Sequence, residues 1–192
     1  MFILFIIFNM KFDVRIIKLP NKVLRQKSVN VTLPLTKEDD LLVQKMMYHV
    51  IDSTKPETHF RPAVGVAAVQ YGVLKNIFFV HILDTEDNIV FSDTIINPKV
   101  IAKSDGLTAL KQGEGCLSVR ETDPNQEGLI KRSERIVVEA YSYNEKKVKT
   151  FDCKQFVAIV FQHELDHLEG KLFIDHIDHK NPWVIEKDLN IL

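Results

Sequence analysis

The chain has 192 residues, of which 45% are hydrophobic and 27% charged, a composition typical of one folded domain and not of a disordered chain. Its 25 lysines and arginines are balanced by 26 aspartates and glutamates, so no overall charge attracts nucleic acid or an anionic membrane. The short basic clusters Lys131–Arg132 and Lys146–Lys147 are interpreted as solvated loops. The two cysteines, Cys116 and Cys153, are too few for a disulfide framework and predict a reducing, cytoplasmic location.

The N-terminal run Met1–Phe8 is entirely apolar, but it is far shorter than the roughly 20 residues that span a bilayer. A secretory signal has a basic region before its apolar run and a small-residue cleavage site after it, and the sequence has neither. We therefore expect residues 1–9 to be a non-essential extension, with Met10 as the alternative start, and residues 10–192 to form a single domain. A first strand that packs on the core is the alternative interpretation.

The first predicted helix begins after Thr36, whose side chain is a suitable N-cap. Three acidic residues follow in the first turn, where the helix dipole favours negative charge. Leu42, Met46 and Val50 recur at helical spacing and predict a helix that ends near Asp52.

A polar loop over residues 53–62 precedes a region of short β-rich runs. Asn144-Glu145 predicts a hairpin turn between the last two of these runs. The runs that predict strands are Val64–Val69, Ile77–His81, Ile95–Ile101, Leu107–Lys111, Arg135–Tyr141 and Val148–Phe151.

The second predicted helix follows the strands, with Asp152 as its expected N-cap and Gln155 at capping-box spacing. Its apolar face also carries His163 and His167, and Gly170 is expected just past its end. The tail over residues 171–192 is expected to be extended. Strands on both sides of a buried helix, with the first helix packed outside, predict an α+β fold of mostly antiparallel sheets around this central helix.

The second helix contains the pattern His163-Glu164-Leu165-Asp166-His167. Residues four apart lie on one helix face, so both imidazoles can reach one metal ion. Glu164 then lies beside the open coordination position, where a general base is needed. The alternative is two ordinary surface histidines, but their apolar face favours a metal because a buried imidazole without a partner is costly.

A catalytic metal of this type has three protein ligands, so a third donor is needed. Glu169, His176 and His179 lie too close along the helix or beyond its end. Cys116 is another candidate, because neighbouring glycines permit a close backbone approach. A single cysteine is more often a buried apolar residue, and this is our interpretation of Cys153.

The small-residue run Ala63–Gln70 ends in an amide donor and by itself is typical of a core strand. Together with the segments Glu114–Ser118 and Gln162–Gly170, in this order, it resembles the motifs of peptide deformylase. The last two segments match E-G-C-L-S and Q-H-E-x-D-H-L-x-G in full, and the first matches G-x-G-x-A-A-x-Q except at Ala63. The resemblance runs from about Met10 to His179 and is closer to the longer form of the family.

This resemblance implies that the domain is catalytic and that the protein is a metal-dependent hydrolase. Such an enzyme removes the N-formyl group from the N-terminal formyl-methionine of newly made polypeptides and releases formate. The resemblance also implies iron(II) as the working ion, although the same ligands also accept zinc or nickel. The ligands it implies are Cys116, His163 and His167. The catalytic groups it implies are Glu164 as the base, with the Gln70 side-chain amide and the Leu117 backbone N–H as donors to the oxyanion.

For the substrate, the resemblance implies that the main chain of Val64, Gly65 and Gly115 pairs with the peptide by β-strand addition. Val64, Ile159 and Val160 are expected to form the wall of an apolar methionine pocket, and Asp166 and Gln162 to support the metal ligands. The expected partners are N-formyl-methionyl nascent peptides, with the ribosome as a second candidate. Neither direct nucleic-acid binding nor a membrane is expected.

Two rival hypotheses stay open at this level. A zinc endopeptidase would use the same helix but would not depend on Cys116. A non-catalytic, metal-stabilised domain could bind peptide or ribosome without turnover, but it would have no use for Glu164. Ala63 is the one departure from the motifs, and a methyl group there could narrow the substrate range if that position requires a positive φ.

Overall fold

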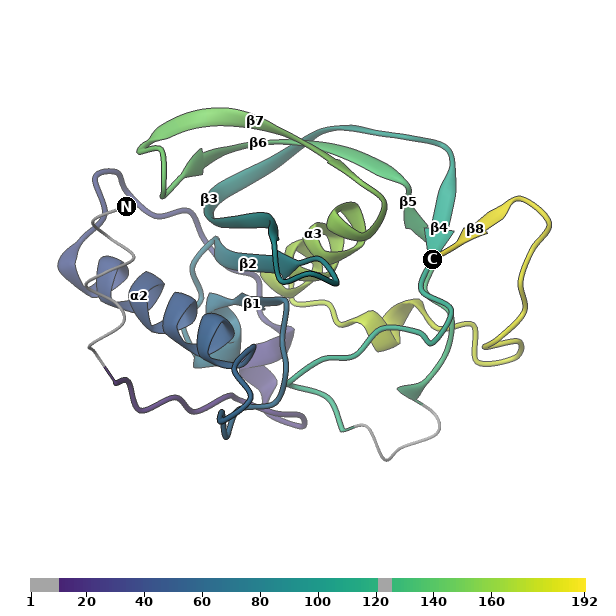
Figure 1. Ribbon diagram of the computed structural model, residues 1–192, viewed down its shortest axis with the longest axis horizontal. Helices are drawn as coiled ribbons and strands as arrows, with labels where there is room; N and C mark the ends of the chain where they lie inside the picture. Colours follow the sequence, from purple (N-terminus) through teal and green to yellow (C-terminus); the bar gives the residue numbers. More distant parts are fainter. Residues whose placement is uncertain (1–10, 121–125) are drawn as a thin grey trace.

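The structure is a computed structural model that describes residues 11–120 and 126–192. Its central element is the helix α3 (Gln155–Leu168), which lies between a five-stranded sheet and a smaller three-stranded sheet (Figure 1). The helix α2 (Lys37–Asp52) packs outside the larger sheet. The expected α+β fold around a central helix is therefore confirmed. The described residues contain no helix long and apolar enough to cross a membrane.

The larger sheet has the strand order β1-β2-β3-β6-β7, with antiparallel pairing between all neighbours. The long strand β3 changes register twice along β6, and such bulges increase the twist of a sheet. The predicted hairpin turn over residues 143–146 joins β6 to β7. These strands are β1 (Gly65–Ala67), β2 (Ile77–Leu83), β3 (Ile89–Lys103), β6 (Arg135–Ser142) and β7 (Lys147–Lys154).

The smaller sheet has the order β5-β4-β8, and its last strand comes from the C-terminal tail. The strands are β4 (Leu107–Ala109), β5 (Arg132–Ser133) and β8 (Leu189–Ile191), and β4 and β8 are parallel. The expectation of a wholly extended tail was therefore wrong in part, since the tail also contains the short 3-10 helix η4 (Phe173–His176). The other 3-10 helices are η1 (Lys22–Arg25) and η2 (Ala68–Tyr71).

The helix α2 forms as its sequence predicts. The Thr36 hydroxyl accepts a hydrogen bond of 3.1 Å from the Asp39 backbone N–H, and the helix ends at Asp52. Its buried face, which includes Met46 and Val50, packs against the apolar side chains of β2 such as Phe79. This packing holds the end of α2, and the loop that follows it, against the larger sheet.

The helix α3 begins later than its capping pattern predicts. Its N-cap is Lys154, whereas Asp152 is still part of β7 and accepts hydrogen bonds of 2.7 and 2.9 Å from Arg135. The prediction was wrong because β6 pairs with β7 as far as Lys154, which commits the Asp152 carboxylate to the sheet. At the other end Gly170 has the expected left-handed φ of 71°, and a Cβ there would lie 2.7 Å from the Arg25 backbone.

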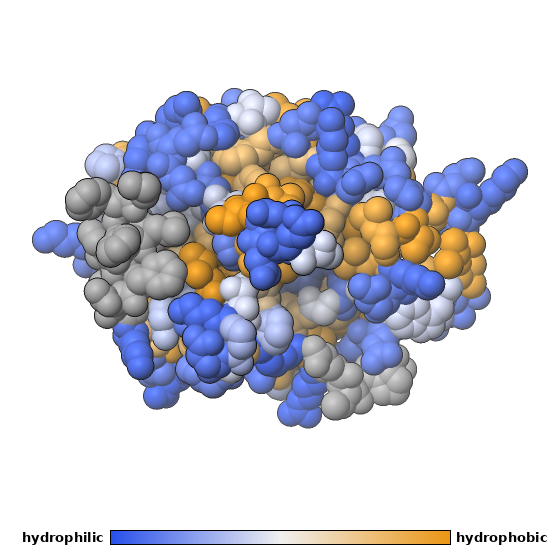
Figure 2. All heavy atoms as spheres, viewed as in Figure 1, coloured by the Kyte–Doolittle hydropathy of each residue, from blue (hydrophilic) through white to orange (hydrophobic). Residues whose placement is uncertain are grey.

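The main core lies between α3 and the larger sheet. Phe161 from the helix contacts Phe78 and Phe91 with ring centroids 5.2 Å apart in each pair. Cys153 belongs to this core and is 2% exposed, which confirms its interpretation as a buried apolar residue. Figure 2 shows polar side chains over much of this face, with apolar side chains at its centre and towards the C-terminal segment. In that segment Trp183, Val184 and Ile185 are exposed.

Candidate functional site

Three buried donor groups meet at the inner face of α3. The Cys116 thiol, from the loop before β5, and the imidazoles of His163 and His167 each offer one atom, and these atoms lie within 4.8 Å of one another. The Cys116 Sγ lies 3.3 Å from the His167 Nε2. Among the residues that the structure describes, this is the one cluster of three such groups able to hold a metal ion. The structure thus brings together all three residues named from the sequence.

The surroundings of Cys116 favour a thiolate. Burial raises the pKa of the thiol, but the adjacent His167 and His163 lower it by more, so that it lies well below its usual range. Two hydrogen bonds also reach the sulfur, from the Gln70 side-chain amide at 3.6 Å and from the Ser118 backbone N–H at 3.5 Å. Because the thiolate is the form of cysteine that binds metal, the local electrostatics suit a metal ligand.

Glu164 lies beside this cluster and is 3% exposed. Burial raises the pKa of its carboxyl group to about 7, although the neighbouring histidines act in the opposite direction. Within the described part of the chain its Oε2 has no hydrogen-bond partner. A carboxyl group with a pKa near neutrality, free on one oxygen, has the properties of a general base or acid.

Gly65 of β1 lies directly against this carboxyl group. A Cβ at Gly65 would stand 2.6 Å from the Glu164 Oε1, so a larger residue there would require this carboxyl group to move. The strand β1 is at the edge of the larger sheet, and the Val64 carbonyl accepts the His81 backbone N–H at 2.8 Å. Since antiparallel pairing alternates along a strand, the peptide groups of Gly65 face the open edge. This edge is where an added strand would pair.

Gln70 is held in place at the end of η2. Its Oε1 accepts the Ala67 backbone N–H at 2.9 Å, and its amide nitrogen also donates to the Ser118 hydroxyl at 3.1 Å. The amide nitrogen therefore points towards the thiol and the adjoining loop. Leu117 lies in that loop and is 9% exposed.

Behind His163 lies a buried ionic network that contains Glu114 and Arg132. Neither residue was assigned a role from the sequence. The His163 Nδ1–H donates to Glu114 at 2.8 Å, and Arg132 donates to both oxygens of Glu114 at 2.8 and 3.0 Å. Burial raises the pKa of Glu114, but the hydrogen bonds from His163 and Arg132 lower it by more, so that the pKa is about 2. Glu114 is therefore an anion that orients the His163 ring, as outer partners of metal-ligating histidines do.

The interpretation of Lys131–Arg132 as a solvated pair was wrong for Arg132, whose side chain is 5% exposed. The guanidinium also pairs with Asp166, which in turn accepts a hydrogen bond of 2.8 Å from His176. A signal was present in the sequence, because the E-G-C-L-S motif places the Glu114 carboxylate two residues before Cys116. No local pattern shows, however, that Arg132 reaches it across 18 positions.

Gln162 anchors α3 to β5. Its amide accepts the Ser133 backbone N–H at 3.0 Å and donates to the Ser133 carbonyl at 2.8 Å. Asp166 and Gln162 thus both contact elements next to Cys116, His163 and His167, as the predicted supporting role requires. That role itself stays a prediction.

An open pocket of about 360 Å³ leads from solvent to the Cys116 and Glu164 side chains. One part of its wall is apolar and includes Leu110, Phe156 and Ile159. Of the residues predicted as ligands, catalytic groups or substrate contacts, only His167 does not line it, and the predicted supports Gln162 and Asp166 lie outside it. The predicted residues that do are Val64, Gly65, Gln70, Gly115, Cys116, Leu117, Ile159, Val160, His163 and Glu164.

Comparison with known proteins agrees with this site. A family model described as "Polypeptide deformylase" matches residues 14–183. The chain belongs to this family. A curated relative, the peptide deformylase of Mycoplasmopsis pulmonis, is 54% identical over 186 residues, which cover 90% of this chain and 94% of the relative. The chain is therefore a hydrolase of the peptide deformylase family, whose metal-dependent members remove the N-formyl group from nascent polypeptides.

Solved structures support the same assignment. The peptide deformylase of Ehrlichia chaffeensis is 30% identical with a TM-score of 0.70, and the match covers 85% of this chain and 87% of that one. A probable peptide deformylase from Synechococcus phage S-SSM7 is 32% identical with a TM-score of 0.68, covering 86% of this chain and 100% of that one. The similarity to deformylases therefore favours the hypothesis of formyl-group removal over that of a zinc endopeptidase.

Proposed function

We propose that Cys116, His163 and His167 hold one divalent metal ion and that the surrounding residues deformylate N-formyl-methionyl peptides. The observation that carries this proposal is the convergence of three buried donor atoms within 4.8 Å beside a carboxyl group with a raised pKa. A non-catalytic role fits this arrangement poorly, because a structural metal site does not need a free carboxyl group beside it.

The donor set fits a metal. It combines a thiol whose pKa lies well below its usual range with two imidazoles, and Glu114 accepts the Nδ1–H of His163, so that the Nε2 of this ring is left as the ligand atom. Soft sulfur and imidazole ligands accept iron(II), zinc or nickel, and the family resemblance favours iron(II). When bound, such an ion supplies Lewis-acid chemistry that makes water a nucleophile at neutral pH.

Glu164 is proposed to take a proton from the attacking water and to pass it to the leaving amine. Its position supports both steps, because its carboxyl group lines the pocket and has one oxygen without a partner among the described residues. The Gln70 side-chain amide and the Leu117 backbone N–H are proposed to donate to the oxyanion that forms on the formyl group. Removal of one such donor typically costs about 2.7–4 kcal/mol of transition-state stabilisation.

The peptide is proposed to add as a strand along the open edge of β1 and to pair with the main chain of Gly65, and Gly115 also lines the pocket. The Val64 carbonyl, whose residue was also predicted to pair with the peptide, is taken by the His81 backbone N–H. Main-chain pairing depends little on the side chains of the peptide, which suits an enzyme that must accept many nascent chains. The apolar part of the pocket, with Val64, Ile159 and Val160, is proposed to hold the methionine side chain. Ala63 is not among the described residues with positive φ, so its methyl group fits an ordinary backbone there.

Residues 10–192 are proposed to form the whole catalytic domain, whereas the prediction for residues 1–9 lies outside the described residues. A reducing, cytoplasmic compartment is also proposed, and both cysteines are free. Docking to the ribosome is a further proposal, which no described contact tests.

Anaerobic turnover of formyl-Met-Ala-Ser, assayed for formate, tests the proposed function. The wild type and the Glu164→Ala variant are loaded with iron(II), and their bound metal is measured before the assay. We expect the variant to keep its metal and to lose at least about 100- to 10,000-fold in kcat, the contribution typical of a general base. If the metal-loaded wild type releases no formate, the proposal is wrong. If Glu164→Ala retains full kcat, Glu164 is not the base.

A further inference from the structure

A second pocket lies against α3, on a different face of the helix from the first pocket. On this helix it is lined by Leu165 and Glu169, whereas the first pocket is lined by Val160 and Glu164. Its volume is about 590 Å³, which is within the range of sites for small molecules. No described residue lines both pockets, so the second pocket is separate from the proposed catalytic site.

The lining of this second pocket is basic, although the whole chain has a formal net charge of −1. Its basic residues are Lys99, Lys103, Lys131, Arg132 and Lys171. The carboxylates that line it are Asp166 and Glu169, and both already have cationic partners. Asp166 pairs with the Arg132 guanidinium group, and Glu169 pairs with the Lys27 ammonium group at 2.7 Å. The pocket therefore has a local excess of positive charge.

Three of these lysines, Lys99, Lys103 and Lys171, form no ion pair with any carboxylate that the structure describes. Their main chain is held in place, because β3 pairs with β6 at both of its lysines. The Lys171 backbone N–H likewise donates to the Asp166 carbonyl at 2.9 Å. Unpaired charges of one sign around a concave surface repel one another and attract a ligand of the opposite sign.

We propose that this pocket binds a small ligand that carries two or more linked phosphate groups. Linked phosphates suit the site because they join several negative charges in one short chain, and lysine ammonium groups bind phosphate as point charges. The same pocket has an apolar part, with Val100, Leu107 and Leu165, that suits the organic portion of a nucleotide. The phosphates therefore come either from an inorganic polyphosphate or from a nucleoside polyphosphate.

A nucleic-acid duplex fits this site less well than a small ligand does. A duplex presents one phosphate after another along a rod, and proteins that bind it spread their basic residues along an extended surface. Here the basic residues converge on one pocket, and the chain as a whole has no excess of positive charge.

Calorimetric titration of the metal-loaded protein at low ionic strength tests the proposal, with inorganic pyrophosphate, ADP and inorganic phosphate as probes. We expect pyrophosphate and ADP to bind with a Kd below about 1 mM, and both values to rise as salt is added. Inorganic phosphate should bind at least about fivefold more weakly than pyrophosphate, because it has fewer charges. The relative affinity of ADP and pyrophosphate shows whether the organic portion contributes to binding.

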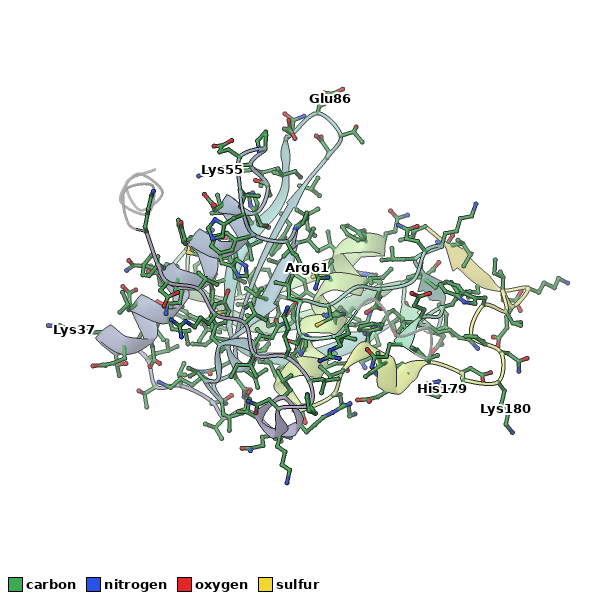
Figure 3. The ribbon with its side chains drawn as sticks, turned by 90° about the horizontal axis from the view of Figure 1, so that it is seen from below. Lys37, Lys55, Arg61, Glu86, His179 and Lys180 are labelled. Carbon is green, nitrogen blue, oxygen red and sulfur yellow. The ribbon has the colours of Figure 1, made fainter. Side chains whose placement is uncertain are left out.

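The double variant Lys99→Gln and Lys103→Gln removes two of the unpaired charges and leaves Arg132 with its partners. It should raise the Kd for pyrophosphate at least about fivefold. The matched control is the double variant Lys37→Gln and Lys180→Gln, which removes the same charge from exposed side chains outside this pocket. Figure 3 shows these two lysines towards opposite ends of the molecule. The control should bind pyrophosphate as the wild type does.

The proposal is wrong if neither pyrophosphate nor ADP binds the wild type at millimolar concentrations. It is also wrong if the pocket variant binds as the wild type does, because the probes would then bind elsewhere, including at the metal. An equal loss in the control variant would assign the binding to overall charge and overturn it. Binding of a short RNA duplex without binding of the small probes would overturn it in favour of a nucleic-acid surface. Since no measurement here uses turnover, these results are distinct from failure of the proposed function.

Discussion

At the scale of single residues, the position of the Glu164 carboxyl group depends on a close contact with β1. Gly65 and Glu164 are the clearest case, because the carboxyl group occupies the volume where any other side chain on β1 would stand. Burial of this carboxyl group, and hence its raised pKa, depends on the same contact. A glycine in an edge strand is therefore part of the environment of the proposed base.

We expect Gly65→Ala to displace the Glu164 carboxyl group and to destabilise the protein by about 1–3 kcal/mol, the usual cost of overpacking. Gly115→Ala is the matched control for stability, since no atom lies within 4 Å of the added Cβ. That variant should stay within about 0.5 kcal/mol of the wild type. Urea unfolding of the three proteins measures the difference, and equal midpoints would show that the Gly65 contact relaxes without cost.

Because His49 is buried, we expect the stability of the protein to depend on pH. His49 is 2% exposed and its ring lies 2.8 Å from the Tyr71 hydroxyl, and burial lowers its pKa to about 4. The unfolded chain takes up a proton below about pH 6.5 and the folded chain only near pH 4, so stability should fall as the pH falls between these values. The expected loss is about 2–3 kcal/mol by pH 4.

The comparison of wild type with His49→Gln isolates this contribution, since all other titrating groups are common to both. Urea unfolding at pH 7 and at pH 4.5 should show a steeper loss in the wild type than in the variant. Parallel losses in the two proteins would mean that His49 is protonated in the folded state.

At the scale of elements, Arg132 connects three segments. It joins the Glu114 loop to the start of β5 and, through Asp166, to the last turn of α3. Lys131 and Arg132 received the same interpretation from the sequence. In the structure Lys131 is exposed and pairs with the exposed Glu186, whereas Arg132 is buried between two carboxylates. Lys131 lies just before β5, whereas Arg132 is its first residue, so only Arg132 is held by the strand against the Glu114 loop.

Arg132→Met should destabilise the protein by about 3–5 kcal/mol, because it leaves the buried Glu114 and Asp166 carboxylates without their partner. It should also weaken metal binding by about 10- to 100-fold through the loss of support for His163. Lys131→Met is the control at the neighbouring position, expected within about 0.5 kcal/mol of the wild type. Chemical unfolding and metal titration measure both effects, and similar results for the two variants would contradict the network.

At the scale of the whole molecule, the proposed metal ligands join parts of the chain that are far apart in sequence. Cys116 comes from a loop of the second half of the fold, and His163 and His167 come from the central helix, about 50 residues later. An ion held by all three would therefore stabilise the folded state as a whole, since the unfolded chain does not present the three donors together.

Removal of metal by a chelator should lower the melting temperature of the wild type. The free energy of unfolding should fall by about 2.7 kcal/mol if the free metal concentration was 100 times the dissociation constant before chelation. Cys116→Ala should show no such shift, while Glu164→Ala should retain it, because Glu164 is not a proposed ligand. Thermal unfolding with and without chelator measures this, and a shift that persists in Cys116→Ala would remove Cys116 from the ligand set.

The sequence by itself determined the features that depend on short-range periodicity. The α2 helix, the hairpin turn at residues 143–146 and the facing pair His163 and His167 follow from spacing along one element, where geometry is set by the local backbone. The predicted ligands, catalytic groups and substrate contacts line the pocket except for His167, whereas the predicted supports Gln162 and Asp166 do not.

Only the tertiary structure decided features that depend on partners distant in the chain. Pairing of β6 with β7 as far as Lys154, with the Arg135 side chain bonded to the Asp152 carboxylate, kept Asp152 in β7 and moved the start of α3 to Gln155. Burial between two carboxylates turned Arg132 from an apparent surface residue into a support of the site. The edge position of β1 likewise arises from assembly. The physical reason is the same in each case: burial and electrostatic pairing are properties of groups brought together in space, and no local pattern of residue types records which groups will meet.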